Sequence, residues 1–386
     1  MSTDAFFLRR SGAAAVWLAI FERARPYAAY IAALAIFAAS RAVVIAGVKF
    51  GELLTVIPDP TRWNAGPAWY HRLLRWDSGF YIRIAETGYQ HSSDPSAYNS
   101  TAFYPLYPLL GRALASATGL DVGVALLIIA NVSLLIAALL MTKLVKDEVG
   151  EDIALWSLAF FLFFPTAFFL SAGYTESLCL VFVLLSLITL RDERFLLASA
   201  FAGLALASRS VGIVLLPVIL WEIYRHRSPS WPRTLATMVL SVVLATSGLT
   251  LYMIYLGTTF GDPTAFATSQ AAWHQGTFVS RFVDALSLRP LHHGGWFLVF
   301  LPLVIWSFGK LQFPIALYGL GALMLPYLTL GITHSMNRFV LMCFPAFIAA
   351  AMLCRTRPLI ACMIIAVFSA FLFQQSALFS QWYWVG

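Results

Sequence analysis

Residues 122–142 read VGVALLIIANVSLLIAALLMT, a run of twenty-one positions without a charged side chain. A helix of about 20 apolar residues is long enough to cross the hydrocarbon core of a bilayer. Comparable runs recur along the 386 residues, of which 60% are hydrophobic and only 11% are charged. This composition excludes a cytosolic enzyme, a secreted disulfide scaffold and a disordered chain. We expect an all-α polytopic membrane protein, because a lipid-facing β-barrel shows only short alternating segments.

The formal net charge of +7 does not indicate nucleic-acid binding. The basic residues flank the apolar runs and do not form one solvated face, which excludes nucleic acid as a partner. No small-residue cleavage site follows the first apolar run, so we expect an uncleaved first helix. The four cysteines lack disulfide or metal-ligand spacing, and we expect them to be small core residues. They are Cys179, Cys343, Cys354 and Cys362.

The apolar runs predict about eleven transmembrane helices in a single domain that covers residues 1–386. They lie near 28–48, 122–142, 153–170, 175–190, 195–208, 211–224, 234–256, 296–308, 312–330, 338–353 and 358–376. If the N-terminus is cytosolic, every second loop should be rich in lysine and arginine. The loops that follow this rule contain Lys143 and Lys146, Arg191 and Arg194, Arg225, Arg227 and Arg233, Lys310, and Arg355 and Arg357.

The stretch 195–224 leaves two alternatives, one long helix or two short segments that meet at Ser208-Arg209-Ser210. One helix would place the basic loop around Arg227 outside and would reverse every later loop. Two segments restore the alternation of basic loops, so we predict a hairpin. A helix of about fourteen residues rises only about 21 Å, so these segments need shelter from the rest of the protein, or a cavity to line.

Two long connections, 49–121 and 257–295, then lie on the extracytoplasmic side. In the first, apolar residues recur at three- and four-residue steps between Pro67 and Tyr89, and most charged residues fall elsewhere. This pattern is typical of amphipathic helices that lie in the membrane interface. We expect the functional surface on this side, because a simple anchor has no need for such loops.

Three carboxylates in the outer half have a distinctive setting. Asp77 precedes an amphipathic helix and is either a helix N-cap or a functional carboxylate. Glu176 begins a predicted span, where the helix dipole also favours a negative charge. Asp262 lies in Phe260-Gly261-Asp262-Pro263, which is typical of a turn.

Three cations on the same side are candidates for binding an anion. Arg209 interrupts an apolar stretch, where an arginine is costly enough to indicate function, with snorkelling to the interface as the alternative. His334 and Arg338 open a predicted span, and a helix N-terminus favours an anion. Anchoring at the membrane interface is the alternative for Arg338.

An ordered set of short motifs resembles the PIG-V family, the second mannosyltransferases of glycosylphosphatidylinositol synthesis and their prokaryotic relatives, in the GT-C superfamily. The motifs are RWDSGFY (75–81), IAETGY (84–89), FYPLYPL (103–109), FPTAFF (164–169), YTES (174–177), FGDP (260–263), NRF (337–339) and FP (344–345). They keep the family's order from about residue 75 to 347. Gly79 stands where the family often has a histidine, so no histidine role is expected there.

The resemblance implies a GT-C-like bundle and a mannosyltransferase with a polyprenyl-phosphate sugar donor of the dolichyl or undecaprenyl type. The acceptor would be a lipid-linked compound or a glycan. The active site would face the periplasm or the lumen, in a bacterial inner membrane or an endoplasmic reticulum membrane. No cofactor or metal is implied, because cations can stabilise the phosphate leaving group.

The family's first-loop aspartate maps onto Asp77, which we expect to be the general base of an inverting transfer. The candidates for binding the donor phosphate are Arg209, Arg338 and His334. The candidate acceptor or substrate contacts are Glu176, Tyr174, Trp76, Tyr81, Asp262 and Gln270. A retaining route would need a second carboxylate as nucleophile, and Glu176 is the candidate for it.

A transporter or flippase of lipid-linked sugars is the alternative function, because a broken helix and an intramembrane arginine also mark transport sites. The lack of an internal repeat and the concentration of polar residues in the outer loops favour the enzyme. A non-catalytic scaffold, the third hypothesis, would leave the setting of Asp77 unexplained.

Overall fold

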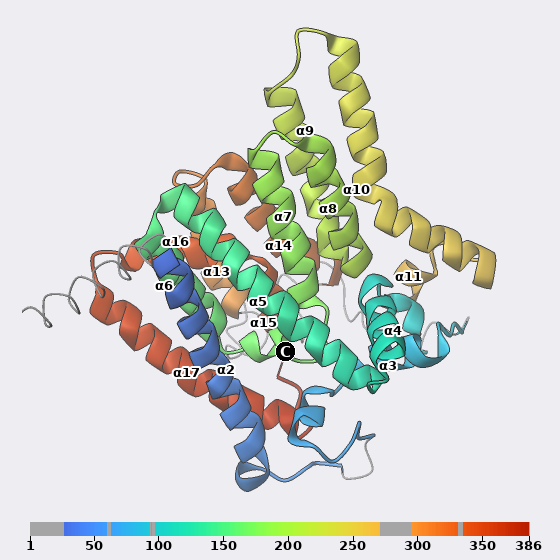
Figure 1. The fold of residues 1–386 in the computed structure, drawn as a ribbon, viewed down its shortest axis with the longest axis vertical. Helices are drawn as coiled ribbons and strands as arrows, with labels where there is room; N and C mark the ends of the chain where they lie inside the picture. The colour runs from blue at the N-terminus through green and yellow to red at the C-terminus, as the bar shows by residue number, and fades with distance from the viewer. Residues whose placement is uncertain are drawn as a thin grey trace, which may run out of the picture.

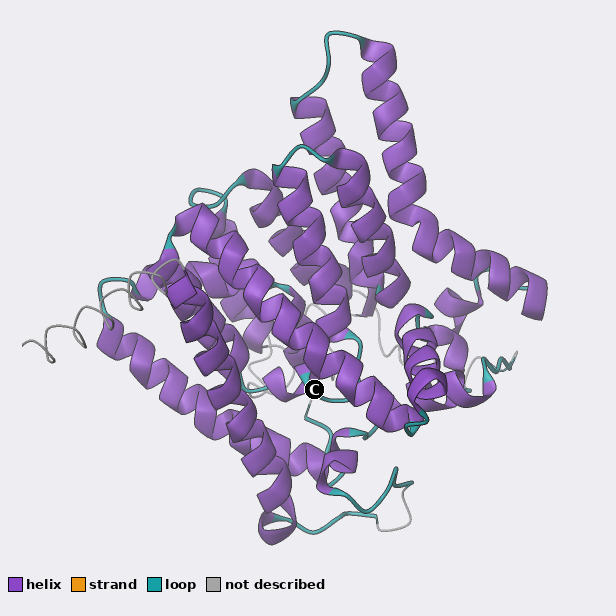
Figure 2. Cartoon of the chain, in the orientation of Figure 1, coloured by secondary structure: helices purple, strands orange, loops and turns teal. Residues whose placement is uncertain are grey.

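The computed structural model describes residues 27–59, 63–92, 94, 97–270, 295–330 and 335–385. These residues form α-helices and short 3-10 helices, and no strand occurs among them (Figure 2). The main helices are α2 (Ala28–Leu54), α5 (Val122–Val149), α6 (Glu151–Phe163), α7 (Glu176–Arg191), α8 (Phe195–Ser208), α9 (Leu215–Arg225), α10 (Trp231–Phe260), α13 (Gly295–Ser307), α14 (Phe313–Leu330), α16 (Phe344–Cys354) and α17 (Pro358–Ser380). The predicted all-helical architecture is confirmed.

Each predicted span corresponds to one helix or to a helix with an adjoining short turn. Within the described ranges, four helices are long and apolar enough to cross a membrane: α2, α5, α10 and α17. A fifth span results if Met336–Met342 and α16, which are bent by 79°, count as one. The helices α8, α13 and α14 are apolar but shorter, so the number eleven stays a prediction.

The chain breaks at Arg209, as predicted. Arg209 has an extended backbone, with φ −156° and ψ 150°, between α8 and the 3-10 turn η5 (Ser210–Val214), which leads into α9. Both segments are therefore short, and α10 covers α8 closely. A Cβ atom added to Gly248 of α10 would lie 2.2 Å from the carbonyl oxygen of Gly203. Such close contact between small residues is typical of helix pairs in membranes.

The loops predicted to be cytosolic lie together at one end of the bundle (Figure 1). The backbone N–H of Gln312, before α14, donates to Glu148 Oε1 at the end of α5, at 2.6 Å. His226, which follows α9, lies 4.0 Å from Glu193 in the loop between α7 and α8. The basic loop after α9 therefore shares an end with the earlier basic loops, and only the hairpin allows this.

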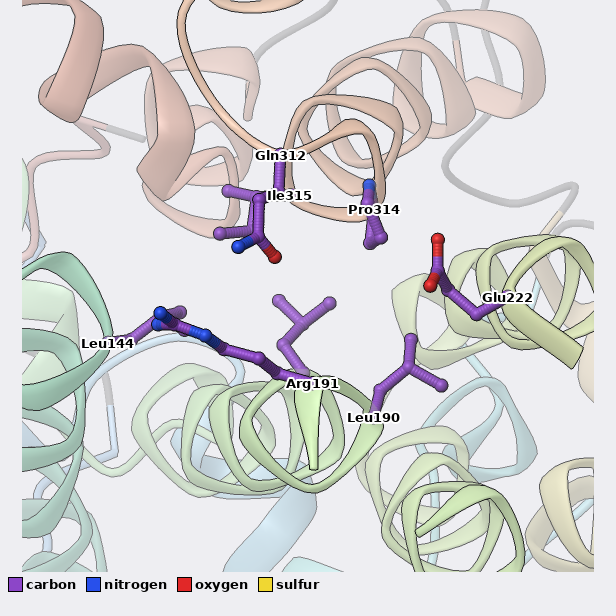
Figure 3. Close-up of a pocket in the computed structure, with 8 residues that line it drawn as sticks. Leu144, Leu190, Arg191, Glu222, Gln312, Pro314 and Ile315 are labelled. Atoms are coloured by element: carbon purple, nitrogen blue, oxygen red, sulfur yellow. The ribbon is translucent and has the colours of Figure 1, made fainter. Parts of the chain in front are cut away.

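A small pocket lies between these helix ends (Figure 3). Arg191 of α7 and Glu222 of α9 line two of its sides. The other lining residues are Leu144, Leu187, Leu190, Gln312, Pro314 and Ile315. Arg191 Nη2 also donates to the carbonyl oxygen of Asp147 at 3.0 Å, so the pocket marks the junction of α5, α7, α9 and α14.

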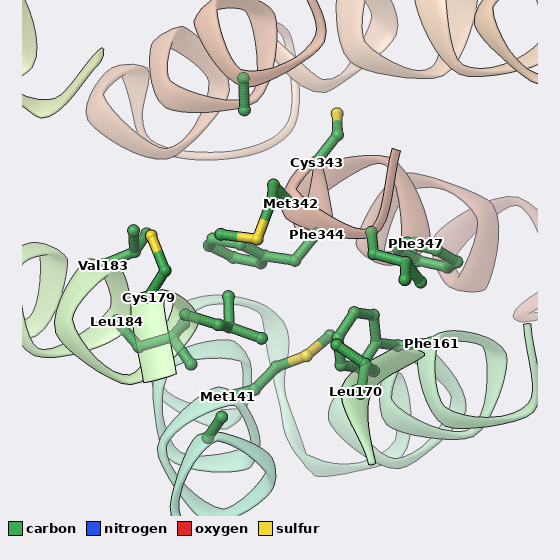
Figure 4. Close-up of a cluster of buried hydrophobic side chains, with 14 of the residues drawn as sticks. Met141, Phe161, Leu170, Cys179, Val183, Leu184, Met342, Cys343, Phe344 and Phe347 are labelled. Carbon is green, nitrogen blue, oxygen red and sulfur yellow. The ribbon is translucent and has the colours of Figure 1, made fainter. Parts of the chain in front are cut away.

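Helix α7 is almost entirely buried in the middle of the bundle. Figure 4 shows Cys179, Val183 and Leu184 of α7 in one cluster with Met141 of α5 and Met342, which precedes α16. The expectation that all four cysteines are core residues is wrong in part: Cys179 and Cys343 are buried, Cys354 is half-buried, and Cys362 on α17 is exposed. The buried faces of α7 fix the direction of this helix, and with it the position of Glu176 at its start.

The first long connection, which the sequence predicts on the outer side, forms short helices. They are η2 (Trp69–Leu73), α3 (Ser78–Thr87), η3 (Ser100–Ala102) and α4 (Leu106–Thr118). The loop begins after Leu54 and not at residue 49, because α2 continues beyond the apolar run. Likewise, α10 extends to Phe260, and residues 271–294 of the second outer loop lie outside the described residues.

We predict two sets of positions on opposite sides of the membrane, because basic loops remain in the cytosol. The cytosolic set is Lys146, Arg194 and Arg227, and the outer set is Asp77, Gln270 and His334. The test uses chains without native cysteines that carry one new cysteine, either at Arg227 or at the exposed Tyr98 of the first outer loop. An impermeant maleimide added to intact cells should label position 98 alone. Labelling at 227 would refute the topology.

Candidate active site

Four charged side chains meet at one end of the bundle, and we call Asp77, Glu176, Arg209 and Arg338 the charged cluster. Glu176 is the first residue of α7, so the cluster lies at the opposite end of this helix from Arg191 and its pocket. Asp77 directly precedes α3, and Arg209 separates α8 from η5. Arg338 belongs to α15 (Met336–Phe339), just before the 79° bend. Every member therefore stands where a helix begins or is interrupted.

The two arginines bridge the two carboxylates. Arg338 Nη1 donates to Asp77 Oδ2 at 2.6 Å, and Arg338 Nε lies 3.2 Å from Glu176 Oε1. Arg209 Nη1 donates to the same Glu176 oxygen at 2.7 Å. Hydrogen bonds between two ionised groups are about twice as strong as neutral ones. Negative and positive groups thus alternate, in the order Asp77, Arg338, Glu176, Arg209.

Burial differs strongly among the four side chains. The Glu176 side chain is fully buried, and the Arg338 side chain is 9% exposed. The exposed fraction is 14% for Arg209 and 20% for Asp77. Removing one partner of a buried ion pair leaves the other charge uncompensated, which is strongly destabilising. Of the two carboxylates, only Asp77 is accessible to a substrate.

Aromatic rings enclose the guanidinium group of Arg338. Its central carbon lies 5.2 to 5.8 Å from the ring centres of Tyr174, Phe339, Phe169 and Trp384. Rings at this distance attract a cation through the cation–π interaction. They also exclude water, and charges attract each other more strongly where the dielectric constant is low.

Asp77 is not the helix cap that the sequence left open. It occupies the N-cap position of α3, but its side chain makes no capping hydrogen bond and binds Arg338 instead. The preceding residue, Trp76, has φ 56°, a left-handed conformation that is uncommon for a bulky residue. Strained conformations of this kind cluster at functional sites.

Contacts with distant segments hold the turn before α3 in place. Arg75 Nε donates to the carbonyl oxygen of Ser380 at 3.3 Å, and its guanidinium lies 4.8 Å from the centre of the Trp382 ring. The hydroxyl of Tyr174 donates to the carbonyl oxygen of Arg75 at 3.2 Å. Burial and the nearby Arg72 lower the pKa of Arg75 to about 10, so Arg75 remains a cation at neutral pH.

A glycine lets the segment before α7 approach this turn. The backbone N–H of Gly173 donates to the carbonyl oxygen of Leu73 at 3.1 Å. A Cβ atom at position 173 would lie 2.5 Å from a methyl carbon of Leu74 and 2.9 Å from Ser78 Oγ. A larger residue at position 173 would therefore force the side chains of Leu74 and Ser78 to shift.

Arg41, which lies within the first predicted span, is a buried cation that was not among the candidates from the sequence. Arg41 is buried in α2, and Arg41 Nη1 donates to Ser171 Oγ at 2.7 Å and to the carbonyl oxygen of Ala167 at 3.2 Å. Its Nη2 donates to the carbonyl oxygen of Leu162 at 3.1 Å. These bonds hold the turn that leads from α6 into α7. The signal was present, because a charged residue inside a span indicates a role.

The remaining sequence candidates lie in different environments. Tyr81 is buried close to the cluster, and burial raises the pKa of its hydroxyl. Asp262 is half-buried and accepts hydrogen bonds from the N–H and the hydroxyl of Thr264, at 2.8 and 2.7 Å, which lower its pKa. Asp262 therefore forms the turn that its sequence motif indicated. Gln270 Nε2 donates to a backbone carbonyl of η3 at 3.0 Å, and His334 lies outside the described residues.

A mostly apolar groove lies beside Arg209. Its lining residues are Arg209, Ser210, Val211, Ala322, Leu325, Pro326, Thr329, Phe339 and Met342. The groove lies between η5, α14 and the segment that follows Arg338. A single cation on an otherwise uncharged wall suits an amphiphilic ligand with an anionic head group. Within the described ranges, no three metal-binding side chains come together.

Fold and site together define a polytopic helical membrane protein with a buried, charge-paired site at one end of its bundle. The profile of the family described as Mannosyltransferase (PIG-V) matches residues 63–283, more than half of the chain. This chain therefore belongs to the PIG-V mannosyltransferase family, as its motifs indicated.

Three individual proteins to which this chain is similar share at most 30% of their residues with it, over part of their length. GPI mannosyltransferase 2 of Drosophila pseudoobscura pseudoobscura is 30% identical over 170 residues, which cover 40% of this chain and 36% of that protein. The structure of ArnT from Cupriavidus metallidurans bound to undecaprenyl phosphate has a TM-score of 0.49 and 14% identity, over 84% of this chain and 60% of ArnT. Archaeal oligosaccharyltransferase AglB from Archaeoglobus fulgidus was solved in complex with an inhibitory peptide and a dolichol-phosphate. Its structure has a TM-score of 0.45 and 12% identity, over 90% of this chain and 55% of AglB.

We predict that Arg41→Met destabilises the protein, because three acceptors in the turn before α7 lose their donor inside the bundle. An unsatisfied buried acceptor costs roughly 1–3 kcal/mol, so the loss should be at least about 2 kcal/mol. Thermal unfolding in detergent measures the effect. Arg355→Met, at an exposed position after α16, is the control and should melt like the wild type. Equal melting temperatures for both variants would show that Arg41 is not structural.

Proposed function

We propose that this protein transfers mannose from a polyprenyl-phosphate donor, dolichyl or undecaprenyl in type, to a lipid-linked or glycan acceptor. The transfer takes place at the extracytoplasmic face of the membrane and inverts the anomeric centre. Family membership supports a membrane glycosyltransferase. The observation that carries the proposal is the Asp77–Arg338 pair, which places an accessible carboxylate beside a cation in apolar surroundings.

The charges around the site favour an anionic ligand. Among the residues that the structure describes, the charged cluster sets two guanidinium groups against two carboxylates, and the buried Arg41 and Arg75 of the adjoining α2 and turn add two cations. The acceptors of Arg41 and Arg75 given above are neutral oxygens. A buried charge is stabilised best by an opposite charge. The phosphate of a lipid-linked sugar would supply it.

The groove beside Arg209 supports a lipid-linked donor over a soluble nucleotide sugar. Most of its wall is apolar, with side chains of Val211, Leu325 and Met342 among them. Isoprenoid methylene groups that pack against this apolar wall would each gain about 0.8 kcal/mol. The phosphate of the same molecule would lie at Arg209.

In the proposed reaction, an acceptor hydroxyl attacks the anomeric carbon of mannose. The bond from the acceptor oxygen to this carbon forms while the bond to the phosphate oxygen breaks, and the electron pair leaves with the polyprenyl phosphate. Arg209 and Arg338 stabilise the negative charge on the leaving phosphate. Asp77 takes the proton of the acceptor hydroxyl.

Arg338 changes its partner in this scheme. Without donor, Arg338 Nη1 binds Asp77 Oδ2, the carboxylate oxygen that the acceptor hydroxyl needs. A phosphate that accepts the hydrogen bond of Arg338 releases this oxygen. Donor binding therefore comes first, and it activates the base.

The burial of Glu176 favours a single displacement. A retaining reaction needs a second carboxylate that reaches the sugar. The Glu176 side chain is fully buried and binds both arginines, so it does not reach a substrate. One accessible carboxylate is enough for inversion.

We predict that Asp77→Asn folds, still binds donor and loses a factor of about 10² or more in turnover, the usual scale for a positioned base. Donor affinity should not fall, because Arg338 no longer has to leave a carboxylate. Transfer of radiolabelled mannose by purified protein measures turnover. Asp121→Asn is the matched control, since Asp121 caps α5 through the N–H of Val124. Normal turnover by Asp77→Asn would remove Asp77 from the mechanism, and donor movement without transfer would favour the transporter.

We predict that Arg209→Gln and Arg338→Gln each weaken binding of the donor lipid by about 2–3 kcal/mol, because each removes a charge-assisted hydrogen bond to phosphate. Arg225→Gln, at the other end of α9, is the control. Binding of the fluorescent donor lipid in nanodiscs gives the affinities. Wild-type affinity in both site variants would place the phosphate elsewhere, with Arg83 and Arg281 as the next candidates.

A further inference from the structure

Glu176 is the member of the charged cluster that contacts both arginines. A single oxygen, Oε1, accepts the hydrogen bond of Arg209 Nη1 at 2.7 Å and lies 3.2 Å from Arg338 Nε. The other oxygen, Oε2, is buried and has no hydrogen-bond partner among the residues described. Two cations that would otherwise repel each other are therefore held beside one anion.

The backbone around Glu176 is fixed relative to the end of α8, where Arg209 stands. The hydroxyl of Thr175 donates to the carbonyl oxygen of Ser208 at 3.3 Å. The hydroxyl of Ser177 donates to the carbonyl oxygen of Leu170 at 2.6 Å. A carboxylate on such a support defines where the two guanidinium groups lie.

We propose that Glu176 is a positioning residue that presents Arg209 and Arg338 as a pair to one phosphate group. It holds Arg338 in place while this arginine exchanges Asp77 for the phosphate. This inference rests on the proposed function, and it assigns to Glu176 a role that needs no contact with substrate. Full burial of its side chain agrees with that role.

A positioning role and a purely electrostatic role lead to opposite expectations. Glu176→Gln removes a negative charge and makes the site more positive by one unit. If only charge mattered, the variant would bind an anion more tightly. If position matters, the variant binds more weakly, because both arginines lose their ionised partner and Arg338 keeps Asp77 alone.

The experiment measures binding of undecaprenyl monophosphate to the purified full chain in nanodiscs, together with kcat and the donor KM. We expect Glu176→Gln to raise the dissociation constant and KM about tenfold and to change kcat less. Glu222→Gln is the matched control, since Glu222 is a buried carboxylate at the other end of the bundle, paired with Arg225 and His226. It should bind like the wild type. Equal or tighter binding by Glu176→Gln would overturn the proposal.

Two further variants add independent tests, and the first of them keeps the proposal testable if Glu176→Gln does not fold. Glu176→Asp keeps the charge but shortens the reach to both arginines, so it should also bind more weakly, and wild-type affinity would overturn the proposal. In the Glu176→Gln/Arg209→Gln double variant, the two losses should be smaller together than their sum, because they remove one shared interaction. Fully additive losses would contradict the pairing.

The outcomes also separate this inference from the proposed function. Wild-type protein that does not bind the lipid phosphate contradicts the proposed function itself. Wild-type protein that binds it with the same affinity as Glu176→Gln contradicts only the role of Glu176.

Discussion

The position of the Arg338 guanidinium group between two carboxylates constrains the rest of this fold. A cation buried among aromatic rings is stabilised most when ionised partners reach it, and here they come from α7 and from the turn before α3. Glu176 in turn holds Arg209 at the break after α8. These charges are therefore compensated only when four parts of the fold are in place. They are the loop that contains Asp77, the central helix α7, the break after α8, and the segment with Arg338 that precedes α16.

Much of the helix arrangement could be predicted from the sequence, because apolar runs and basic loops report directly on the free energy of placing residues in a bilayer. The break at Arg209 followed from this reasoning. The ends of the helices could not be predicted in this way, since they depend on tertiary contacts. Helix α2 continues past the apolar run to Leu54, and Glu52 in this extension pairs with Arg72 of η2. The number of transmembrane spans could not be predicted either, because neighbouring helices decide whether a short apolar helix crosses the membrane.

The members of the charged cluster could be selected one by one, since a charge in apolar surroundings is costly wherever it occurs. The pairing of these charges could not be predicted, because Asp77 and Arg338 lie on segments that only packing brings together. The assignment of Glu176 as a substrate contact failed to anticipate its burial for the same reason. The partners of Arg41 could not be predicted, because they are mostly backbone oxygens, which leave no trace in sequence composition. The role of Asp262 in a turn was easier to predict, since its hydrogen bonds come from a residue two positions away.

The pairing of α7 with α8 also bears on how the chain enters the membrane during synthesis. Helix α8 has 14 residues and would rise only about 21 Å, so it is a poor insertion signal by itself. Glu176 and Arg209 lie at the same end of this helix pair and neutralise each other, so α7 and α8 can enter the lipid together without an unpaired charge at that end. Arg338 emerges from the ribosome much later, and until then the turn with Asp77 lacks its cation. Assembly of the outer surface is thus tied to translation of the last part of the chain, and a truncated product would expose an unfinished loop to quality-control proteases.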